Sequence, residues 1–231
     1  MGVSGGPNII EDGLVLCLDA GSTKSYPGSG TTSIDLSGRN NGTLVNGITL
    51  SSDGGGSFEF DGTDDYITFG DLELITGAFS INVWFRASST QNDTTYPTIV
   101  SKDAAGSFGN WIMTGPSSGA YVRFGFSGSG GQKELSNTSY SDFTSNEWVN
   151  YCGTWDGSNT LRLYRNSIQI KETTSATGTL VTNNNPILIG NRSATDGRFT
   201  GKIAIVKLYN KELSSSEVLQ NYNATKTRFG L

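Results

Sequence analysis

The sequence predicts a single all-β sandwich, and three observations carry that prediction. Apolar residues recur at every second position in segment after segment. The 31 glycines, together with many Ser, Thr and Asn residues, separate these segments as turns. Only one segment, near the C-terminus, has helical periodicity. A length of 231 residues is normal for one large β-sandwich, so we expect a single domain over residues 1–231.

The expected strands are short and are separated by polar turns. The segments with alternating apolar residues are GLVLCLDA, SFEF, DYITFG, FSINVWFRAS, PTIVSK, AYVRFGFSG, EWVNYCGTW, TLRLYRNSIQIKE, PILIGN and GKIAIVKLYN. Alternation in FSINVWFR predicts one face with Phe79, Ile81, Val83 and Phe85 and another with Asn82, Trp84 and Arg86. Such strands are packed on one face and partly covered on the other.

Two turns between these segments predict hairpins. Asp61-Gly62 lies between SFEF and DYITF, and Arg165-Asn166-Ser167 lies between LRLY and IQIKE. The dipeptide Asp156-Gly157 and the run GSGG at residues 128–131 predict loops.

The predicted helix covers residues 213–225. Ser214 is followed three positions later by Glu217, which is the pattern of a capping box, and Leu213, Val218 and Leu219 give the helix an apolar side. We expect this helix to pack against an edge or an end of the sandwich. Residues 1–12 are expected to form an N-terminal arm and residues 226–231 a tail that is either ordered or a contact point for a partner.

Composition and charge exclude several classes of function. The formal net charge of -5 and the pI of about 4.7 argue against binding to nucleic acid, because the field of the protein repels phosphate. The sequence contains no histidine, which excludes Ser-His or Cys-His hydrolytic sites and ordinary zinc sites.

The cysteines and the N-terminus point to a soluble protein. Cys17 and Cys152 lie far apart inside apolar strand patterns, so we expect two buried thiols and no disulfide. The N-terminal residues lack a basic region followed by a long apolar core, and no apolar run approaches the ~18 residues of a membrane span. We therefore expect neither an export signal nor a contact with a membrane.

Taken together, ten segments resemble one protein family. They are GLVLCLDA, SYPGSGTT, DLSGRNNGTLVNG, FEFDGTDDYI, FSINVWFR, TIVSKD, WVNYCGTWDG, LRLYRNS, ILIGN and FTGKIAIVKLYNKELSSSEVLQNY. Their order and spacing, from about Gly13 to Tyr222, resemble the laminin-G-like branch of the concanavalin A-like lectin/glucanase superfamily. This resemblance implies a jelly-roll sandwich of two antiparallel sheets with one short C-terminal helix.

A finer resemblance concerns the setting of the domain. LDAGSTKSYPGSGTT, DLSGRNNGTLVNG and YNKELSSSEVLQNYNATKTRFGL are similar to stand-alone domains in structural proteins of tailed bacteriophages, especially marine and cyanobacterial ones. The resemblance implies a non-enzymatic virion protein, made in the bacterial cytoplasm, whose partners are other capsid, tail or fibre proteins. Host-surface polysaccharide is a further candidate ligand. A homo-oligomer is compatible with this setting, because proteins on symmetric capsid or fibre axes are often cyclic oligomers, but the sequence does not determine the oligomeric state. The alternatives are a carbohydrate-binding lectin-like module and a glucanase-type glycoside hydrolase.

The hydrolase alternative depends on the acidic stretch FEFDGTDDYITFG. Glucanases of the superfamily carry E-x-D-x-x-E on one strand, and Glu59, Asp61 and Asp64 give E-x-D-x-x-D. Alternation places Glu59 and Asp61 on one face, but Gly62 and Thr63 predict a turn that takes Asp64 out of the row. We therefore interpret the stretch as a turn capped by the side chain of Asp61, with no catalytic residues.

The resemblance also implies calcium as a candidate cofactor, although not a required one. Candidate ligands are Asp35 with backbone carbonyls of DLSGRNNG, joined by Asp19 or Asp61. Relatives often carry G-x-I-D-x-V near the last strand, whereas this chain has Ala204 at the position of that carboxylate. A turn-forming role for Asp35 is the alternative.

Glycan binding needs exposed aromatic faces and planar polar groups. The candidate loop aromatics are Trp111, Tyr96, Tyr140 and Tyr26, with Asn110 and Arg192 as polar partners. Trp84, Trp148 and Trp155 fall in predicted strands and are expected to be structural.

Overall fold

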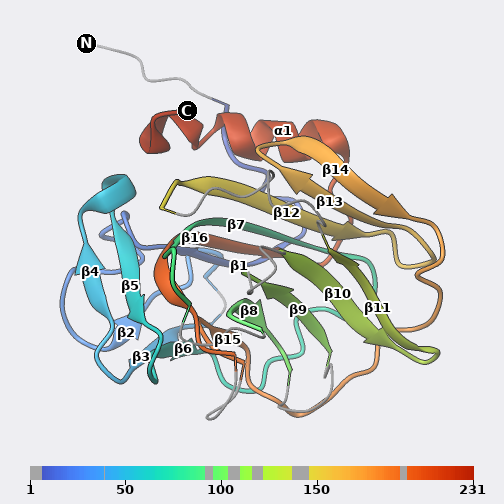
Figure 1. Cartoon of the computed structure of the whole chain (residues 1–231), viewed down its shortest axis with the longest axis horizontal. Coiled ribbons are helices and arrows are strands. Elements are labelled where there is room, and N and C mark those ends of the chain that lie inside the picture. The colour runs from blue at the N-terminus through green and yellow to red at the C-terminus, as the bar shows by residue number, and fades with distance from the viewer. Residues whose placement is uncertain are drawn as a thin grey trace.

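The protein is an all-β sandwich of two antiparallel sheets that face each other, with one α-helix lying across one of them (Figure 1). The computed structural model describes residues 7–38, 40–91, 96–103, 110–115, 122–136, 146–192 and 197–231. This architecture confirms the predicted all-β sandwich of two antiparallel sheets with one short C-terminal helix. None of the helices in the described ranges is long and apolar enough to cross a membrane.

The first sheet carries the helix on its outer face. In spatial order its strands are β14 (Ile168–Thr173), β13 (Leu161–Arg165), β12 (Val149–Trp155), β7 (Phe79–Ala87), β16 (Thr200–Tyr209), β5 (Ser57–Asp61) and β4 (Thr49–Ser51), with β1 (Leu14–Asp19) also paired to β16. The strand closest to the C-terminus, β16, thus lies in the middle of this sheet.

The second sheet closes the other side of the core. Its strands are β11 (Gly131–Ser136), β10 (Arg123–Gly128), β9 (Trp111–Thr114), β8 (Thr98–Ser101), β15 (Leu188–Ile189), β6 (Tyr66–Thr68), β3 (Gly42–Val45) and β2 (Thr32–Ser33). A short 3-10 helix, η1 (Asp53–Gly55), connects β4 to β5.

The core lies between the sheets and follows the predicted alternation. The side chains predicted to face inward from β7 all belong to the main apolar cluster, which confirms the assignment of its two faces. Phe79 contacts Phe124 of the second sheet with a ring-centroid distance of 5.4 Å. Gly153 lies under Phe124, where an added Cβ would come within 2.2 Å of the ring, so only glycine permits this approach.

The helix α1 (Ser215–Asn223) begins with the predicted capping box. Ser214 accepts a hydrogen bond from the backbone N–H of Glu217, whose side chain accepts one from the backbone N–H of Ser214. The helix packs on the outer face of the first sheet and not, as predicted, against an edge or an end. Val218 joins Tyr209 and Cys152 in a second apolar cluster on this face, which gives the helix a better surface than an edge would.

The residues after the helix form a 3-10 helix, η3 (Lys226–Phe229), on the same face. The ring of Phe229 stacks on Trp84 at 4.0 Å, and Tyr222 stacks on the same indole at 5.7 Å. The guanidinium of Arg228 donates to Gly54 O at 2.6 Å and to Asp19 Oδ1 at 2.6 Å. The end of the chain is therefore packed firmly on the outer face of the first sheet.

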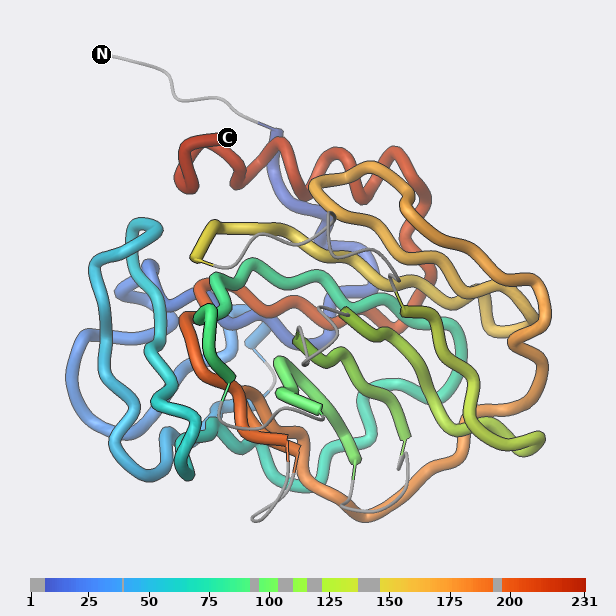
Figure 2. Tube along the Cα trace, in the orientation of Figure 1, coloured from blue at the N-terminus to red at the C-terminus, as the bar shows by residue number. Residues whose placement is uncertain are grey.

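One of the two predicted hairpins is confirmed and the other is wrong. β13 and β14 pair through the turn at Asn166-Ser167, where both residues have positive φ. By contrast, β5 and β6 do not pair, because β5 belongs to the first sheet and β6 to the second. The turn after Asp61 therefore carries the chain across the sandwich, as Figure 2 shows for this part of the trace.

Both cysteines are free and buried, as predicted. Burial raises the pKa of the Cys17 thiol to about 11, with smaller contributions from neighbouring charges. It raises the pKa of the Cys152 thiol to about 12. The two thiols therefore stay protonated in the folded protein at neutral pH.

Candidate functional site

A pocket of about 560 Å³ opens at the corner of the first sheet where β4, β5, β16 and β7 end. Polar and charged side chains dominate its described wall, and they include Asn46, Glu59, Asp61, Arg86, Asn146 and Lys202. The aromatic residue that lines it, Phe60, is only 1% exposed, because its ring faces the core. The pocket thus offers hydrogen-bonding groups and little stacking surface.

Strand register builds the floor of the pocket. Thr49 of β4 lies opposite Glu59 of β5, and Glu59 lies opposite Lys202 of β16. Lys202 in turn lies opposite Arg86 of β7. These four residues form one row across four strands, so a ligand in the pocket would meet one side chain from each.

Asp53 of η1 holds the two cations of this row. Its Oδ2 lies 2.5 Å from Arg86 Nη1 and 3.2 Å from Lys202 Nζ, and its Oδ1 accepts a hydrogen bond from Trp148 Nε1 at 3.2 Å. Burial by itself would raise the pKa of Asp53, but the bonds from Trp148 and Lys202 and the charge of Arg86 outweigh it and lower that pKa. The cations are therefore fixed, while the side chain of Glu59 stays 50% exposed.

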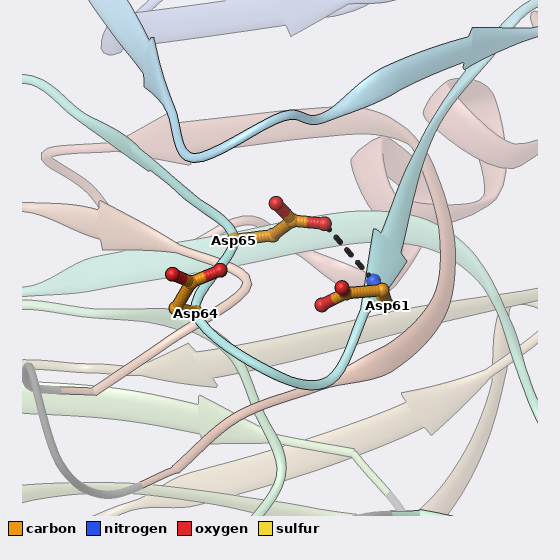
Figure 3. Close-up of side chains that lie close together, drawn as sticks. All are labelled: Asp61, Asp64 and Asp65. Carbon is orange, nitrogen blue, oxygen red and sulfur yellow. Dashed lines mark hydrogen bonds between the residues drawn. The ribbon is translucent and has the colours of Figure 1, made fainter.

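Asp61 and Asp65 of the acidic turn also line the pocket, and Figure 3 shows them together with Asp64. Asp61 Oδ1 accepts the backbone N–H of Thr63 at 2.6 Å, which confirms the predicted capping role. Asp65 Oδ2 accepts the backbone N–H of Asp61 at 3.0 Å, the bond drawn as a dashed line in the figure. One carboxylate oxygen from each of Asp61, Asp64 and Asp65 lies within 4.8 Å of the others.

Asp65 is the buried member of this group. It is 6% exposed, and its Oδ1 has no hydrogen-bond partner. Burial raises the pKa of Asp65, and the negative charges of Asp61 and Asp64 add to the rise. A carboxylate in this position therefore has an unfavourable electrostatic environment.

The carboxylate of Asp35, the first of the predicted calcium ligands, is occupied by donors of the protein itself. Asp35 is 1% exposed and its carboxylate accepts hydrogen bonds from the N–H of Cys17 at 2.8 Å, the N–H and hydroxyl of Ser37 at 2.9 and 2.6 Å, and the N–H of Asn40 at 3.2 Å. These donors occupy both oxygens, so Asp35 does not fit an ion and matches the alternative prediction of a turn former.

Asp19 is also engaged elsewhere. Its Oδ1 accepts hydrogen bonds from the N–H of Gly21 at 2.9 Å and from Arg228 at 2.6 Å. Both Asp35 and Asp19, which was predicted with Asp61 as an alternative second carboxylate, therefore already hold donors of the protein itself. Within the part of the chain that the structure describes, the carboxylates that do gather are Asp61 and its neighbours Asp64 and Asp65.

Three of the predicted glycan contacts, Trp111, Asn110 and Tyr26, are buried. Trp111 lies in β9 and is 1% exposed within the main apolar cluster, so the prediction that it lies on a loop is wrong. Asn110, directly before it, is fully buried, with its backbone bonded to Lys102 and Ser127. Tyr26 is 7% exposed and donates its hydroxyl proton to a backbone carbonyl. In the strand β9, the alternation of side chains directs Trp111 into the core. The glycines before it in GSFGNWIM made this segment look like a loop in the sequence.

The structure brings two other candidates together. The guanidinium of Arg192 lies over the ring of Tyr96 at 5.4 Å, and that of Arg123 lies over the same ring at 4.9 Å. Arg192 also pairs with Asp103 at 2.5 Å. Tyr140 lies outside the described residues.

The three acidic residues that resemble the glucanase pattern E-x-D-x-x-E do not lie in one row on a strand. Glu59 and Asp61 are both exposed on the same face of β5, as predicted. β5 ends at Asp61, and Gly62 has φ of 77°, so Asp64 leaves the row. Three pocket residues, Arg86, Lys202 and Asn146, are far apart in the chain and were not predicted from the sequence. The register of β7 and β16 pairs Arg86 with Lys202, and the backbone N–H of Asn146 donates to the carbonyl of Ala87 at the end of β7.

Several solved structures share this fold. The binding domain of Paraclostridial Mosquitocidal Protein 1 is 18% identical with a TM-score of 0.71, over 93% of this chain and 52% of that one. The botulinum neurotoxin serotype D binding domain is 19% identical with a TM-score of 0.71, over 92% of this chain and 52% of that one. The chain thus spans about half the length of these toxin domains.

A third similar structure is close in length to this chain. Domain 4 of AbnA, a GH43 extracellular arabinanase from Geobacillus stearothermophilus, was solved in complex with arabinotriose. It is 15% identical with a TM-score of 0.67, over 90% of this chain and 98% of that domain. Identities this low show a shared fold and nothing finer.

Sequence comparison identifies the family. No curated protein matches the chain. Residues 61–219, more than half of the chain, match the Laminin_G_3 family, described as the Concanavalin A-like lectin/glucanases superfamily. The chain therefore belongs to the concanavalin A-like lectin/glucanases superfamily.

Proposed function

We propose that the protein binds carbohydrate in the pocket at the corner of the first sheet, and that it does so without cleaving it. The observation that carries the proposal is the row formed by Thr49, Glu59, Lys202 and Arg86, which presents hydroxyl-bonding groups from four strands to one pocket. Carboxylates and amides arranged around a concave surface suit the hydroxyl groups of a sugar.

The fold relatives support a binding role over a catalytic one. Two of those described above are binding domains of toxins, and the third is an arabinanase domain in complex with arabinotriose. Within the pocket, the side chain of Glu59 is half exposed, while Asp53 holds the neighbouring cations in place. A preorganised wall of this kind lowers the entropy cost of binding a flexible glycan.

A glycan array, followed by calorimetry with the best hit, tests this proposal. Replacement of Glu59 by Ala removes a charged acceptor worth about 1.5–3 kcal/mol, so we expect binding to weaken by about tenfold or more. Glu11→Ala removes the same side chain from an exposed position in the N-terminal segment and should leave the affinity unchanged. Equal affinities of the two variants would place the site elsewhere, and an array without any hit would contradict carbohydrate binding.

The virion role implied by the sequence resemblance is a separate proposal about where the domain acts. In that setting the pocket would face host-surface polysaccharide, while other surfaces would contact capsid, tail or fibre proteins. Mass spectrometry of purified particles from a phage that encodes this chain is the test. Particles that lack the chain would contradict the virion role without affecting the carbohydrate proposal.

A further inference from the structure

We propose that Lys207 forms a proton-sensitive switch under η3, in which protonation of its side chain loosens residues 225–231 from the first sheet. Lys207 belongs to β16 and is 2% exposed, on the face of the sheet that α1 and η3 cover (Figure 1). Side chains hold η3 in place, chiefly the guanidinium of Arg228 and the ring of Phe229. Residues 225–231 lie outside the strands, so they can move away without breaking a bond between strands.

Strand register places Lys207 at the boundary between the contacts of η3 and those of α1. Its neighbours on the outer face of β16 are Ile205 and Tyr209, two positions away on either side. Ile205 shares an apolar cluster with Phe229 of η3, and Tyr209 shares another with Val218 of α1. Movement of η3 would therefore open one side of Lys207 while α1 stays in place.

The amine of Lys207 has no partner in this closed arrangement. Within the described part of the chain, its Nζ is buried and makes no hydrogen bond. Asn82, which lies opposite Lys207 on β7, also has a buried Oδ1 without a partner. An ionised amine costs free energy in such surroundings, because no bond within the protein replaces its contacts with water.

The charge of protonated Lys207 acts on the ion pair that anchors η3. Arg228 Nη1 lies 2.6 Å from Asp19 Oδ1, and both charged groups are close enough to Lys207 to influence its ionisation. Protonated Lys207 repels the guanidinium and attracts the carboxylate, so it competes with Arg228 for Asp19. Once η3 moves, Asp19 can pair with the lysine and water can reach Nζ. The ionised lysine therefore favours the open arrangement, and the neutral lysine favours the closed one.

The sign of the pH effect follows from burial. Burial lowers the pKa of Lys207 in the closed arrangement, and the charge of Arg228 adds to this effect. The groups that act in the opposite direction and offset it only in part are Cys17, Asp19 and Cys152. In the open arrangement the amine is hydrated, and its pKa returns toward the ordinary value of about 10.4. Opening therefore takes up a proton, so it becomes more favourable as the pH falls from about 10.4 to the lowered value.

Lys207 is the group on this face whose charge we expect to change between about pH 6 and pH 9. The sequence contains no histidine, and burial raises the pKa values of both thiols and of three nearby tyrosines, which are Tyr164, Tyr209 and Tyr222. The other charged groups around α1 and η3 are Asp12, Lys211, Glu217 and Lys226. Carboxylates and ordinary lysines keep their charge in this range. A thiol exposed by opening would titrate near about 8.5, but it would favour opening at higher pH, which is the opposite sign.

Hydrogen exchange of single amides, followed by NMR, tests the proposal on the whole chain without any sugar. A single 3-10 turn does not persist alone, so the amides of Arg228 and Gly230 exchange when η3 leaves the sheet. Corrected for intrinsic rates, they give the opening constant of η3, and the amides of β7 give that of the whole domain. We expect the constant of η3 to be the larger one and to increase by up to about tenfold for each unit by which the pH falls from about 9 to 6. Lys207→Met takes up no proton on opening, so this increase should be absent.

Lys207→Gln provides a second neutral side chain, for use if the Met variant does not fold, and should likewise show no increase. The matched control is Lys24→Met, which removes an exposed lysine after β1 and should keep the pH dependence of the unchanged protein. An η3 constant that does not increase as the pH falls would overturn the proposal, as would the same increase in the Lys207 variants. Equal constants for η3 and β7 would also overturn it, because the whole domain would then open. Loss of the dependence in Lys24→Met would overturn the assignment to Lys207 and point to net charge.

Discussion

At the scale of single residues, the aspartates of this protein differ in the partners that surround their carboxylates. Asp35 fixes a buried turn through four donors, Asp53 holds two cations, and Asp65 stays buried with one oxygen unpaired. Asp156 resembles Asp35, because its carboxylate accepts the backbone N–H groups of Ser158, Asn159 and Thr160 at 2.8–3.0 Å. The number of donors around each carboxylate distinguishes a structural aspartate from a candidate ligand.

Replacement of Asp156 tests the structural role of such a turn. Burial by itself would raise the pKa of Asp156, but the hydrogen bonds from Thr160, Ser158 and Asn159 outweigh it and lower that pKa well below its usual range. We expect Asp156→Ala to lower the free energy of unfolding by about 1–2 kcal/mol at neutral pH, after allowance for partial exposure. Urea unfolding followed by fluorescence measures the change.

The same replacement predicts a pH dependence. Because the folded pKa is depressed, the contribution of the Asp156 carboxylate is complete above the unfolded value of about 3.9 and is lost as the pH falls through the folded pKa. Asp156→Asn keeps an oxygen for the N–H groups but has no charge to lose. The stability difference between it and the unchanged protein should therefore shrink as the pH falls below about 4, and a constant difference would contradict this assignment.

At the scale of elements, the C-terminal segment stabilises the outer face of the first sheet. Trp84 stacks with both Tyr222 of α1 and Phe229 of η3, while Arg228 links η3 to Asp19 at the end of β1. Three donors of one guanidinium are used, on Asp19 and on the carbonyls of Gly54 and Gly56. A lysine cannot reproduce this forked arrangement.

We expect Phe229→Ala to cost about 2–4 kcal/mol of unfolding free energy, because it removes a largely buried ring from the stack on Trp84. Arg228→Lys should cost about 1–2 kcal/mol through the loss of bonds to backbone carbonyls. Thr227→Ala, on the exposed side of η3, is the matched control. Thermal unfolding that is equal in Phe229→Ala and Thr227→Ala would show that the segment adds nothing to stability.

What the sequence could predict depends on the range of the interactions. Alternation in β7 and the capping box of α1 are local patterns, so the faces of β7 and the start of the helix were predicted correctly. The turn after Asp61 was predicted as a hairpin, because a hairpin and a crossing between sheets carry the same local pattern. The pocket row joins residues 49, 59, 86 and 202, and this depends on the register of distant strands, which no local pattern reveals.

At the scale of the whole molecule, the two cysteines report on global unfolding. Cys17 lies in β1 and Cys152 in β12, and both are buried in the first sheet. With pKa values raised to about 11 and about 12 by burial, neither offers much thiolate at pH 8. We expect both thiols to react with a disulfide reagent only as fast as the protein unfolds, and at once in denaturant.

Single-cysteine variants separate the two thiols. Cys17→Ala and Cys152→Ala should each leave one thiol whose modification rate follows the unfolding rate measured by fluorescence. A thiol that reacts much faster than this rate would show local opening of its strand and would contradict a cooperative first sheet.

The position of β16 also has a consequence for synthesis on the ribosome. β16 covers residues Thr200–Tyr209, yet it pairs with β1, β5 and β7, which are made long before it. Until this strand emerges, β5 and β7 present unpaired edges to other nascent chains, and long-range pairing of this kind is slow. The growing polypeptide is therefore exposed to misassembly during most of translation, and its yield in cells should depend on chaperones that bind extended, apolar segments.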